Sequence, residues 1–449
     1  MDSAVGRRLV FVLTLSLVGF VGLGFRLYQL MMHPEKQYCK SHSRMYQGHI
    51  YLPAQRGHIL DRNSNPLATE KTAWDLYVTG RPENPKEFAR IVGSTLNQDP
   101  ETLIKRLPEK DGQDKLVSRD IPGEIYDQLA AALEKYSETT EKEERAKWSL
   151  RPRFLRFYPE GDLASNVIGY VGADQVGLGG IEYTFQNRLE GAPERVIVPV
   201  DSLRNILAEN DYIKQANVRG ADVILTIDAW IQHTVEQEIR NLMDRSQATQ
   251  AMAVVIEPKT GEILAMAAVP SFDPNDYQRY GEFRRKCRPV TDMFEPGSVI
   301  KPFIVAGALE AGAVTPDRVF DCERGNYAVR GANGRVLKVI HDDIHRFDRL
   351  SVRDIVVRSS NIGICKIAAQ LGAAGVSDIL RRFGFGLLSG VELPGETPGI
   401  LRSPDSRGWS ALSMYAMPYG QEMATNCLVI TAAYSILANR GLRVQPHIV

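Results

Sequence analysis

The chain has 449 residues, with 54 basic and 54 acidic side chains and therefore no formal net charge. That length accommodates two or three domains with cores of their own. The balanced charge gives no indication of nucleic acid or another polyanion as a partner. Any function is therefore carried by local motifs rather than by overall charge.

The N-terminal segment has the composition of a membrane-spanning helix. Arg7 and Arg8 precede 17 uncharged residues, Leu9 to Phe25, and Leu27 to Met32 continue the apolar character after one arginine. This length is near the lower limit for spanning a bilayer. A cleaved signal peptide has a shorter apolar core that ends in small residues, and no such site follows Phe25. We predict an uncleaved anchor within residues 1–32, with the following residues outside the cytoplasm because the basic residues precede the span.

Residues 45–220 mix helical and strand-like patterns with many loops, which predicts an α+β domain. Nothing in this region clusters as a catalytic site. Arg56, Asp61 and Arg62 lie close together in the chain, and their opposite charges indicate a structural ion-pair network. We expect this domain to support a catalytic domain rather than to contain the chemistry.

The pattern changes after residue 220. A strand from Asp222 to Thr226 and an amphipathic helix from Trp230 to Met243 are followed by two β-like runs, Met252 to Glu257 and Glu262 to Ala268, and then mainly by helices. Lys259-Thr-Gly261 lies between the two runs, and Thr-Gly is typical of a turn. These residues are predicted to close a β-hairpin.

The strongest chemical signal is Ser298-Val-Ile-Lys301, which follows a Pro-Gly break. The apolar run from Val299 to Leu309 predicts a buried helix. Residues three apart share one face of a helix, so the Ser298 hydroxyl and the Lys301 amine can meet. Burial lowers the pKa of a lysine amine, which lets the neutral amine take a serine proton. The motif predicts an activated serine nucleophile; the alternative is a helix N-cap serine followed by an exposed lysine.

A second motif, Arg358-Ser-Ser-Asn361, places Ser359 61 residues after Ser298. It lies between two helical or mixed apolar stretches, so it predicts an inter-helix loop. Such a loop brings a hydroxyl and an amide to the serine–lysine pair, where the hydroxyl can relay a proton and the amide can hold a substrate backbone group. A Ser/Asn-rich N-cap is the alternative. The order of the two motifs favours the catalytic interpretation.

The run His341-Asp-Asp-Ile-His345 contains residue types that ligate zinc. The next helix is predicted to begin only near Ser351, and the run lies in the span between the two serine motifs. We therefore expect an exposed loop here and no metal site.

The cysteines are odd in number and widely spaced, which excludes a disulfide framework and a Cys-x-x-Cys metal site; they are Cys39, Cys287, Cys322, Cys365 and Cys427. Cys365 lies beside the second serine motif on an apolar helix and is expected to be a small core residue. Whether Cys287 and Cys322 pair stays open.

Further segments accompany the serine motifs in a fixed order: Arg56 to Ala68, Gly177 to Tyr183, Leu225 to Asp228 with Gln232, Thr260 to Met266, and Pro270 to Asn275. Together they resemble the class B penicillin-binding proteins, the membrane-anchored D,D-transpeptidases that cross-link bacterial peptidoglycan. The resemblance covers nearly the whole chain. In the first segment, Ser64 stands where the family usually has glycine.

The resemblance implies an α+β architecture in three parts. A transmembrane anchor in residues 1–32 precedes a non-catalytic pedestal, or dimerisation, domain at 45–220. A serine penicillin-binding/β-lactamase-like transpeptidase domain follows at 221–449. The implied location is the bacterial cytoplasmic membrane, with a single span and the catalytic domain outside the cytoplasm.

The resemblance also implies the chemistry. Ser298 is the expected nucleophile and Lys301 its base, while Ser359 and Asn361 relay the proton and orient the peptide. No metal or cofactor takes part. The implied partners are peptidoglycan stem peptides, β-lactams and a membrane-bound polymerase of cell-wall synthesis; a septal or a lateral-wall role stays open.

One family element is absent from residues 1–449. The family places a third catalytic motif, Lys-Thr-Gly, on a strand after the Ser-x-Asn motif, whereas Lys259-Thr-Gly261 precedes Ser298. We therefore expect an incomplete transpeptidase domain that lacks one oxyanion-hole donor, and whose remaining hairpin has an uncovered apolar face. Two other functions stay open: a catalytically silent membrane scaffold, and a β-lactam-hydrolysing or sensing domain. The pedestal segment at 56–68 argues against the second.

Overall fold

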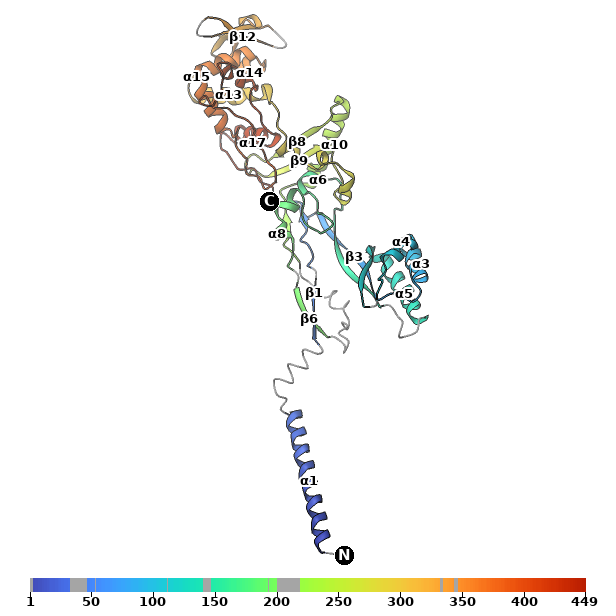
Figure 1. Cartoon of the computed structure of the whole chain (residues 1–449). Coiled ribbons are helices and arrows are strands. Elements are labelled where there is room, and N and C mark those ends of the chain that lie inside the picture. The colour runs from blue at the N-terminus through green and yellow to red at the C-terminus, as the bar shows by residue number, and fades with distance from the viewer. Residues whose placement is uncertain are drawn as a thin grey trace. The chain divides into compact units, whose positions relative to one another are not determined.

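The structure, a computed structural model, describes residues 3–32, 47–52, 54–110, 112–139, 147–192, 194–199, 219–331, 334–342 and 346–449. The chain divides into two compact units, each made of several segments. Unit 1 comprises Met1–Gln55, Ala73–Arg153 and Ala192–Arg219; unit 2 comprises Arg56–Thr72, Phe154–Gly191 and Gly220–Val449. Both units contain helices and strands (Figure 1), which confirms the α+β prediction.

The first element of unit 1 is the long helix α1 (Ser3–Met32). Its stretch Leu9–Gln29 has a mean hydropathy of 2.1 over 21 residues, and none of it is buried within the protein. A helix of this length that exposes apolar side chains all round suits the interior of a bilayer. The predicted span, Leu9 to Phe25, lies within this helix.

The rest of unit 1 is a small α+β core. Strand β4 (Asp114–Pro122) pairs antiparallel with β3 (Pro66–Thr79), and β3 also pairs with β5 (Lys147–Phe157). Three helices pack on one another and on the strands around Phe88, Val92 and Leu129; they are α3 (Pro85–Leu96), α4 (Pro100–Arg106) and α5 (Gly123–Thr139). A separate antiparallel pair joins β1 (Gln47–Leu52) to β6 (Glu194–Pro199).

Unit 2 contains the predicted hairpin. Strands β8 (Ala251–Ile256) and β9 (Ile263–Val269) pair antiparallel. Gly261 in the connecting turn has a φ of +87°, and its N–H donates to the Glu257 carbonyl at 2.9 Å. The hairpin prediction for Lys259-Thr-Gly261 is therefore confirmed. The preceding helix α10 (Ala229–Ser246) begins at Asp228, whose carboxylate caps it by accepting bonds from two backbone N–H groups.

Helices pack against both faces of β9. Ala267 and Val269 form a cluster with Ile239 of α10. Met266 belongs to another cluster with Val290 of α12 (Arg288–Thr291) and Leu428 of α17 (Cys427–Ala438). The expectation of an uncovered apolar face is therefore wrong for this strand, which is buried at every position except Leu264.

The other half of unit 2 is mainly helical. Figure 1 shows α13 (Lys301–Glu310), α14 (Val352–Val357) and α15 (Asn361–Arg382) gathered together. Together with α17 they bury a core that includes Phe303, Ile355 and Ile367. Two antiparallel strand pairs border it, β10 (Val319–Asp321) with β13 (Arg349–Ser351) and β11 (Asn326–Arg330) with β12 (Val336–His341).

Short elements complete unit 2. The strands β2 (Ile59–Leu60) and β7 (Val223–Ile224) pair in parallel. The remaining short helices are α6 (Ser165–Ile168), α7 (Gly180–Thr184), α8 (Gln186–Leu189), η1 (Pro274–Arg279), α11 (Glu282–Arg285), η2 (Gly297–Ile300), η3 (Glu323–Gly325), α16 (Ser413–Ala416) and η4 (Met417–Tyr419).

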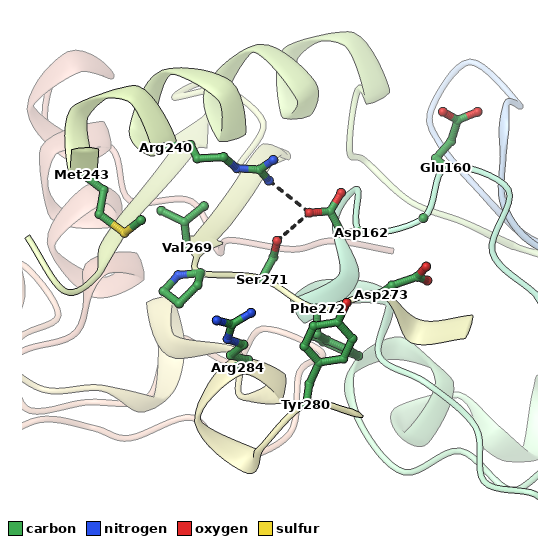
Figure 2. Close-up of a pocket in the computed structure, with 12 residues that line it drawn as sticks. Glu160, Asp162, Arg240, Met243, Val269, Ser271, Phe272, Asp273, Tyr280 and Arg284 are labelled. Carbon is green, nitrogen blue, oxygen red and sulfur yellow. Dashed lines mark hydrogen bonds and ion pairs between the residues drawn. The ribbon is translucent and has the colours of Figure 1, made fainter. Parts of the chain in front are cut away.

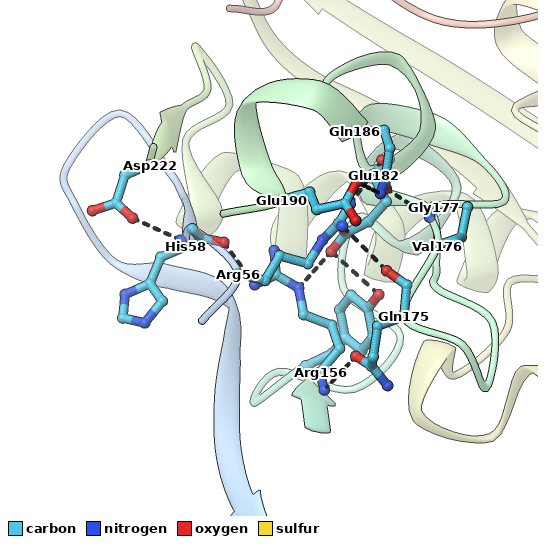
Figure 3. A network of polar contacts seen from close by, with 12 residues as sticks. Arg56, His58, Arg156, Gln175, Val176, Gly177, Glu182, Gln186, Glu190 and Asp222 are labelled. Carbon is cyan, nitrogen blue, oxygen red and sulfur yellow. Dashed lines mark hydrogen bonds and ion pairs between the residues drawn. The ribbon is translucent and has the colours of Figure 1, made fainter. Parts of the chain in front are cut away.

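A buried ion-pair network joins the segments Arg56 to Ala68 and Gly177 to Tyr183 (Figure 3). Arg56 Nε lies 2.7 Å from one carboxylate oxygen of Glu182, and Arg156 Nε lies 2.6 Å from the other. The Tyr158 hydroxyl donates to the same carboxylate at 3.3 Å. Burial, followed by the charge of Glu182, raises the pKa of Tyr158 well above its usual value, so this phenol stays a neutral donor.

The predicted network of Arg56, Asp61 and Arg62 is thus only partly correct. Asp61 is buried, but its carboxylate accepts hydrogen bonds from the backbone N–H groups of Asn63, Asn65 and Ala229 rather than pairing with Arg56. Arg62 lies 3.5 Å from Glu262, in an ion pair whose side chains are about one-third exposed. Asp61 therefore stabilises the loop that contains Asn63 and Asn65. Arg56 instead pairs with Glu182, which lies in a distant segment of the sequence.

Candidate active site

The predicted nucleophile lies on a 3-10 turn rather than inside an α-helix. Ser298 follows Gly297, whose φ is +62°, and the Lys301 N–H donates to the Ser298 carbonyl to close the turn. Side chains three residues apart are eclipsed in a 3-10 helix, so Ser298 and Lys301 still share a side. Ser298 is exposed, whereas Lys301 begins α13 and is 1% exposed. The serine is open to solvent and its predicted base is not.

The buried Lys301 amine contacts residues of the second motif, Arg358 to Asn361. Lys301 Nζ lies 2.5 Å from the Ser359 carbonyl oxygen, 3.0 Å from Ser359 Oγ and 2.7 Å from Asn361 Oδ1. The structure therefore brings three of the four predicted site residues into direct contact. Ser298, the fourth, is one turn away along the chain. The alternative of an exposed lysine after an N-cap serine is wrong.

Local backbone geometry explains why the second motif can make these contacts. Ser359 adopts a left-handed conformation with φ of +57°, which ends α14 and turns its own carbonyl toward Lys301. Ser360 caps α15 by accepting the Gly363 N–H at 2.9 Å. The N-cap interpretation is thus correct for Ser360, while its two neighbours contact the lysine.

Two contributors were missed in the sequence. The Asp342 carboxylate accepts bonds from Ser360 Oγ at 3.0 Å and from the Ile362 N–H at 3.1 Å, so it holds the N-terminus of α15. The Asn361 amide donates to the His341 carbonyl at 3.0 Å. His341 ends strand β12 rather than lying in a loop, and residues 343–345 of the predicted loop fall outside the described part of the chain. No local pattern links this strand to the serine motif.

The segment Tyr419 to Thr425 holds the other side of the serine turn. The Gly297 N–H donates to the Gly420 carbonyl at 3.1 Å, and Phe294 and Thr425 exchange two backbone bonds of 3.0 Å. Gly420 has a φ of +79°, and a Cβ there would overlap the backbone of Gly297. Glycine is therefore required where this segment meets the nucleophile turn.

Comparison with known proteins identifies the family. Residues 51–225 match the penicillin-binding protein dimerisation domain, and residues 251–449 match the penicillin binding protein transpeptidase domain. The chain is 30% identical to the "Probable peptidoglycan D,D-transpeptidase PbpC" of Pseudomonas aeruginosa, over 97% of this chain and 74% of the relative. The chain belongs to the class B penicillin-binding proteins.

Other class B penicillin-binding proteins give the same result. The "Probable peptidoglycan D,D-transpeptidase PenA" of Neisseria meningitidis is 31% identical over 87% of this chain, and the chain spans 64% of its length. A crystal structure of penicillin binding protein 3 from Mycobacterium tuberculosis, complexed with aztreonam, superposes with a TM-score of 0.62 at 27% identity, covering 89% of this chain and 67% of that one. The penicillin-binding-protein fold is thus shown independently of the motifs.

Three thiols of this penicillin-binding protein lie in its hydrophobic cores. Cys287, Cys322 and Cys365 are buried free thiols, and Cys287 and Cys322 belong to different hydrophobic clusters, so they do not pair with each other here. Burial raises the pKa of Cys365 to about 12, although the nearby Lys301 lowers it. The prediction of Cys365 as a core residue is confirmed; Cys39 lies outside the described residues.

A cavity of about 480 Å³ lies elsewhere in unit 2, between α10 and the segment after β9 (Figure 2). Asp162 is one of its lining residues, and its carboxylate lies 3.1 Å from Arg240 and 2.7 Å from the Ser271 hydroxyl. None of the predicted site residues lines it. Within the described ranges, no three His, Cys, Asp or Glu side chains gather in a way that would hold a metal ion.

Proposed function

We propose that this chain carries the acylation chemistry of a peptidoglycan D,D-transpeptidase, with Ser298 as nucleophile and Lys301 as base. The contacts of the Lys301 amine are the observation that supports this. A neutral amine has two N–H groups and one lone pair, which suit two carbonyl acceptors and one hydroxyl that can donate. An ammonium donates to all three. Ser359 supplies one carbonyl and the hydroxyl, and Asn361 supplies the other carbonyl. The site can therefore hydrogen-bond both the neutral amine and the ammonium form of Lys301.

The proposed reaction is a two-step acyl transfer. Ser298 Oγ attacks the carbonyl carbon of the penultimate D-alanine of a stem peptide while Lys301 takes its proton. The bond from that carbon to the terminal D-alanine nitrogen breaks, and the nitrogen leaves with a proton relayed through Ser359. An amine of a neighbouring strand then attacks the ester, Ser298 recovers a proton, and the two peptides are joined. Asn361 holds the peptide backbone during both steps.

The proposed organisation follows the motifs. Residues 1–32 anchor the chain in the cytoplasmic membrane, residues 45–220 form the pedestal domain and residues 221–449 belong to the transpeptidase domain. The catalytic residues lie outside the cytoplasm, where stem peptides, β-lactams and a polymerase partner are reached. The exposed apolar surface of α1 supports the anchor.

Labelling with a fluorescent penicillin tests the function. The wild-type protein should form a covalent adduct that survives denaturation, and Ser298→Ala should not. Ser246→Ala, which changes an exposed serine at the end of α10, is the matched control and should label normally. Labelling of Ser298→Ala at the wild-type level would refute the assignment of the nucleophile. Absence of labelling in a folded wild-type protein would favour the silent membrane scaffold instead.

A further inference from the structure

The cavity of about 480 Å³ beside α10 has the size and lining of a ligand-binding site. Such sites in proteins have volumes of about 300–1,000 Å³, with apolar walls and a few polar groups. The apolar part of this wall is supplied by Met243, Val269, Phe272 and Tyr280. Every lining residue belongs to unit 2, and none of the serine-motif residues is among them. The cavity is therefore separate from the proposed catalytic residues.

Aromatic and polar contacts hold the wall of this cavity from behind. The Phe272 side chain is 1% exposed. Its ring packs edge-on against Tyr280, with centroids 6.2 Å apart, and against Tyr170 at 5.7 Å. The buried Arg288 guanidinium donates to the Pro270 carbonyl at 3.3 Å. The wall is thus formed before a ligand arrives, which lowers the entropic cost of binding.

A second cavity, of about 440 Å³, adjoins the first. Both are lined by Asp162 and Arg240, which form an ion pair of 3.1 Å. On α10 the lining runs from His233 and Glu236 through Arg240 to Met243, a spacing that keeps these side chains on one helix face. The helix advances roughly 15 Å over this stretch, which equals about four or five residues of extended peptide. The two cavities therefore suit an extended ligand.

Two charged side chains of the first cavity have no hydrogen-bond or ion-pair partner in the part of the chain that the structure describes. One is the exposed Arg284, whose guanidinium lies 5.8 Å from the centroid of the Tyr280 ring. The other is the exposed Glu160, and Figure 2 shows these two residues on opposite sides of Asp162. Asp162 itself is already neutralised by Arg240. The cavity thus presents one uncompensated charge of each sign.

The opposite signs of these charges define the class of ligand. A neutral glycan would use neither charge, and a polyanion would be repelled by Glu160. A peptide that carries both an ammonium and a carboxylate satisfies both side chains through charge-assisted hydrogen bonds. Its aliphatic groups can pack on the apolar wall and bury area there.

We propose that the two cavities form a non-catalytic binding site for a peptide that carries an ammonium and a carboxylate, with the ammonium at Glu160 and the carboxylate at Arg284. The proposed occupant is a stem peptide, because the proposed reaction uses stem peptides that have a free amine and a terminal D-alanine carboxylate. This inference rests on the proposed function and adds a site away from Ser298. A strand held there stays close to the protein between acyl transfers.

Charge-matched probes test this site in the full chain with Ser298→Ala, kept in detergent micelles, where acylation of that serine cannot interfere. The parent probe is Nα-acetyl-lysyl-D-alanyl-D-alanine, which carries one ammonium and one carboxylate. Its Nε-acetyl form lacks the ammonium, and its C-terminal amide lacks the carboxylate. Ligand-observed NMR titration gives the affinity of each probe for this background and for the same chain with Glu160→Gln or Arg284→Gln. Thermal unfolding shows that each variant is folded.

The matched controls are Glu238→Gln and Arg245→Gln. Glu238 and Arg245 form an exposed ion pair of 3.9 Å on α10 and line neither cavity. Their replacement should leave the affinity of every probe unchanged. Tyr280→Ala should weaken all three probes by the same factor, because it removes part of the apolar wall and no charge.

Glu160→Gln should weaken the parent probe by about 10-fold and leave the Nε-acetyl form unchanged. Arg284→Gln should weaken the parent probe by a similar factor and leave the amide unchanged. Losses that are equal for charged and uncharged probes, no loss in either variant, or no binding of the parent probe would each overturn the proposal.

The all-L isomer of the parent probe distinguishes a stem peptide from a segment of a protein, which has L-residues only. Weaker binding of the all-L isomer supports a stem peptide as the occupant, and equal or tighter binding overturns it. Acylation of the wild-type protein by penicillin, which tests the proposed function, is measured separately. The failure of one proposal is therefore not mistaken for the failure of the other.

Discussion

Arg56 and Glu182 form a buried ion pair across 126 residues of sequence, with Arg56 Nε 2.7 Å from Glu182 Oε2. Arg156 binds the other oxygen of the same carboxylate at 2.6 Å and also donates to the Gly57 carbonyl. One carboxylate thus serves two buried guanidinium groups. This makes Glu182 the member of the network whose loss leaves the most charge uncompensated.

We expect Glu182→Ala to lower the free energy of unfolding by about 3–5 kcal/mol, because both arginines lose their buried counter-ion. Urea unfolding followed by circular dichroism measures this. The comparison is Arg62→Met, which removes an ion pair of 3.5 Å whose side chains are about one-third exposed, and should cost less than about 1 kcal/mol. Similar losses for the two variants would show that burial does not set the strength of the Glu182 network.

Lys301→Met should reduce the rate of acylation by penicillin by roughly 100- to 10,000-fold, since the serine loses its general base. The buried carbonyl groups of Ser359 and Asn361 also lose a donor, so stability should fall by about 1–3 kcal/mol. Stopped-flow acylation and thermal unfolding separate the two effects. Lys366→Met should acylate at the wild-type rate, and a comparable rate for Lys301→Met would exclude Lys301 as the base.

Ser64→Gly should stabilise the protein. Ser64 has a φ of +66°, in the left-handed region where a side chain is strained, and its N–H closes a turn to the Asp61 carbonyl at 3.0 Å. Removing the Cβ relieves this strain, but glycine also has more conformational freedom to lose on folding. The net increase in the free energy of unfolding should be up to about 1 kcal/mol. Ser64→Ala, which keeps the Cβ, should bring no such gain. A lower melting temperature for the glycine variant would contradict this account.

The thiols of Cys287, Cys365 and the partly buried Cys427 should resist alkylation in the folded protein. Burial raises the pKa of Cys287 and Cys365 to about 12 and that of Cys427 to about 11. A raised pKa keeps the thiol protonated, and only the thiolate reacts, so iodoacetamide at pH 8.5 should modify these residues slowly. In urea their pKa returns to about 8.5 and modification becomes fast. Peptide mass spectrometry follows each site, and rapid reaction of native Cys365 would show that its environment is open.

A reporter fused after residue 45 tests the membrane topology. Basic residues precede the apolar helix, so the fusion should be active as an exported alkaline phosphatase and inactive as a cytoplasmic β-galactosidase. Replacing Arg7 and Arg8 with glutamate removes this bias and should lower the phosphatase signal. Activity of the galactosidase fusion in the unaltered chain would reverse the orientation.

The sequence predicted the parts of the site that depend on short spacing. Ser298 with Lys301 and Ser359 with Asn361 are local patterns, and the hairpin around Lys259-Thr-Gly261 follows from turn chemistry and alternation. The hairpin forms and Lys301 contacts Ser359 and Asn361 because a turn or the start of a helix is decided within a few residues. The catalytic roles of these residues stay predictions.

Contacts between distant segments were not predictable in the same way. Nothing near Asp342 indicates that it holds the start of α15, and nothing near Arg56 indicates Glu182 rather than Asp61 as its partner. Both pairings satisfy a polar group that is buried only once the chain has folded. The uncovered face expected for the hairpin was wrong for β9 for the same reason, since the helices that cover this strand come from both sides of it in the sequence.

The hydrogen bond from Gly297 to Gly420 has a consequence for biosynthesis. The turn that presents Ser298 is completed by a carbonyl group far downstream. On the proposed topology, the turn therefore cannot take its final shape while the chain is still emerging from the ribosome and crossing the membrane. Until Gly420 has been synthesised and has reached the same compartment, the turn that carries Ser298 lacks the hydrogen bond from Gly297. The site therefore assembles late, and a chain caught part-way through export should not yet react with penicillin.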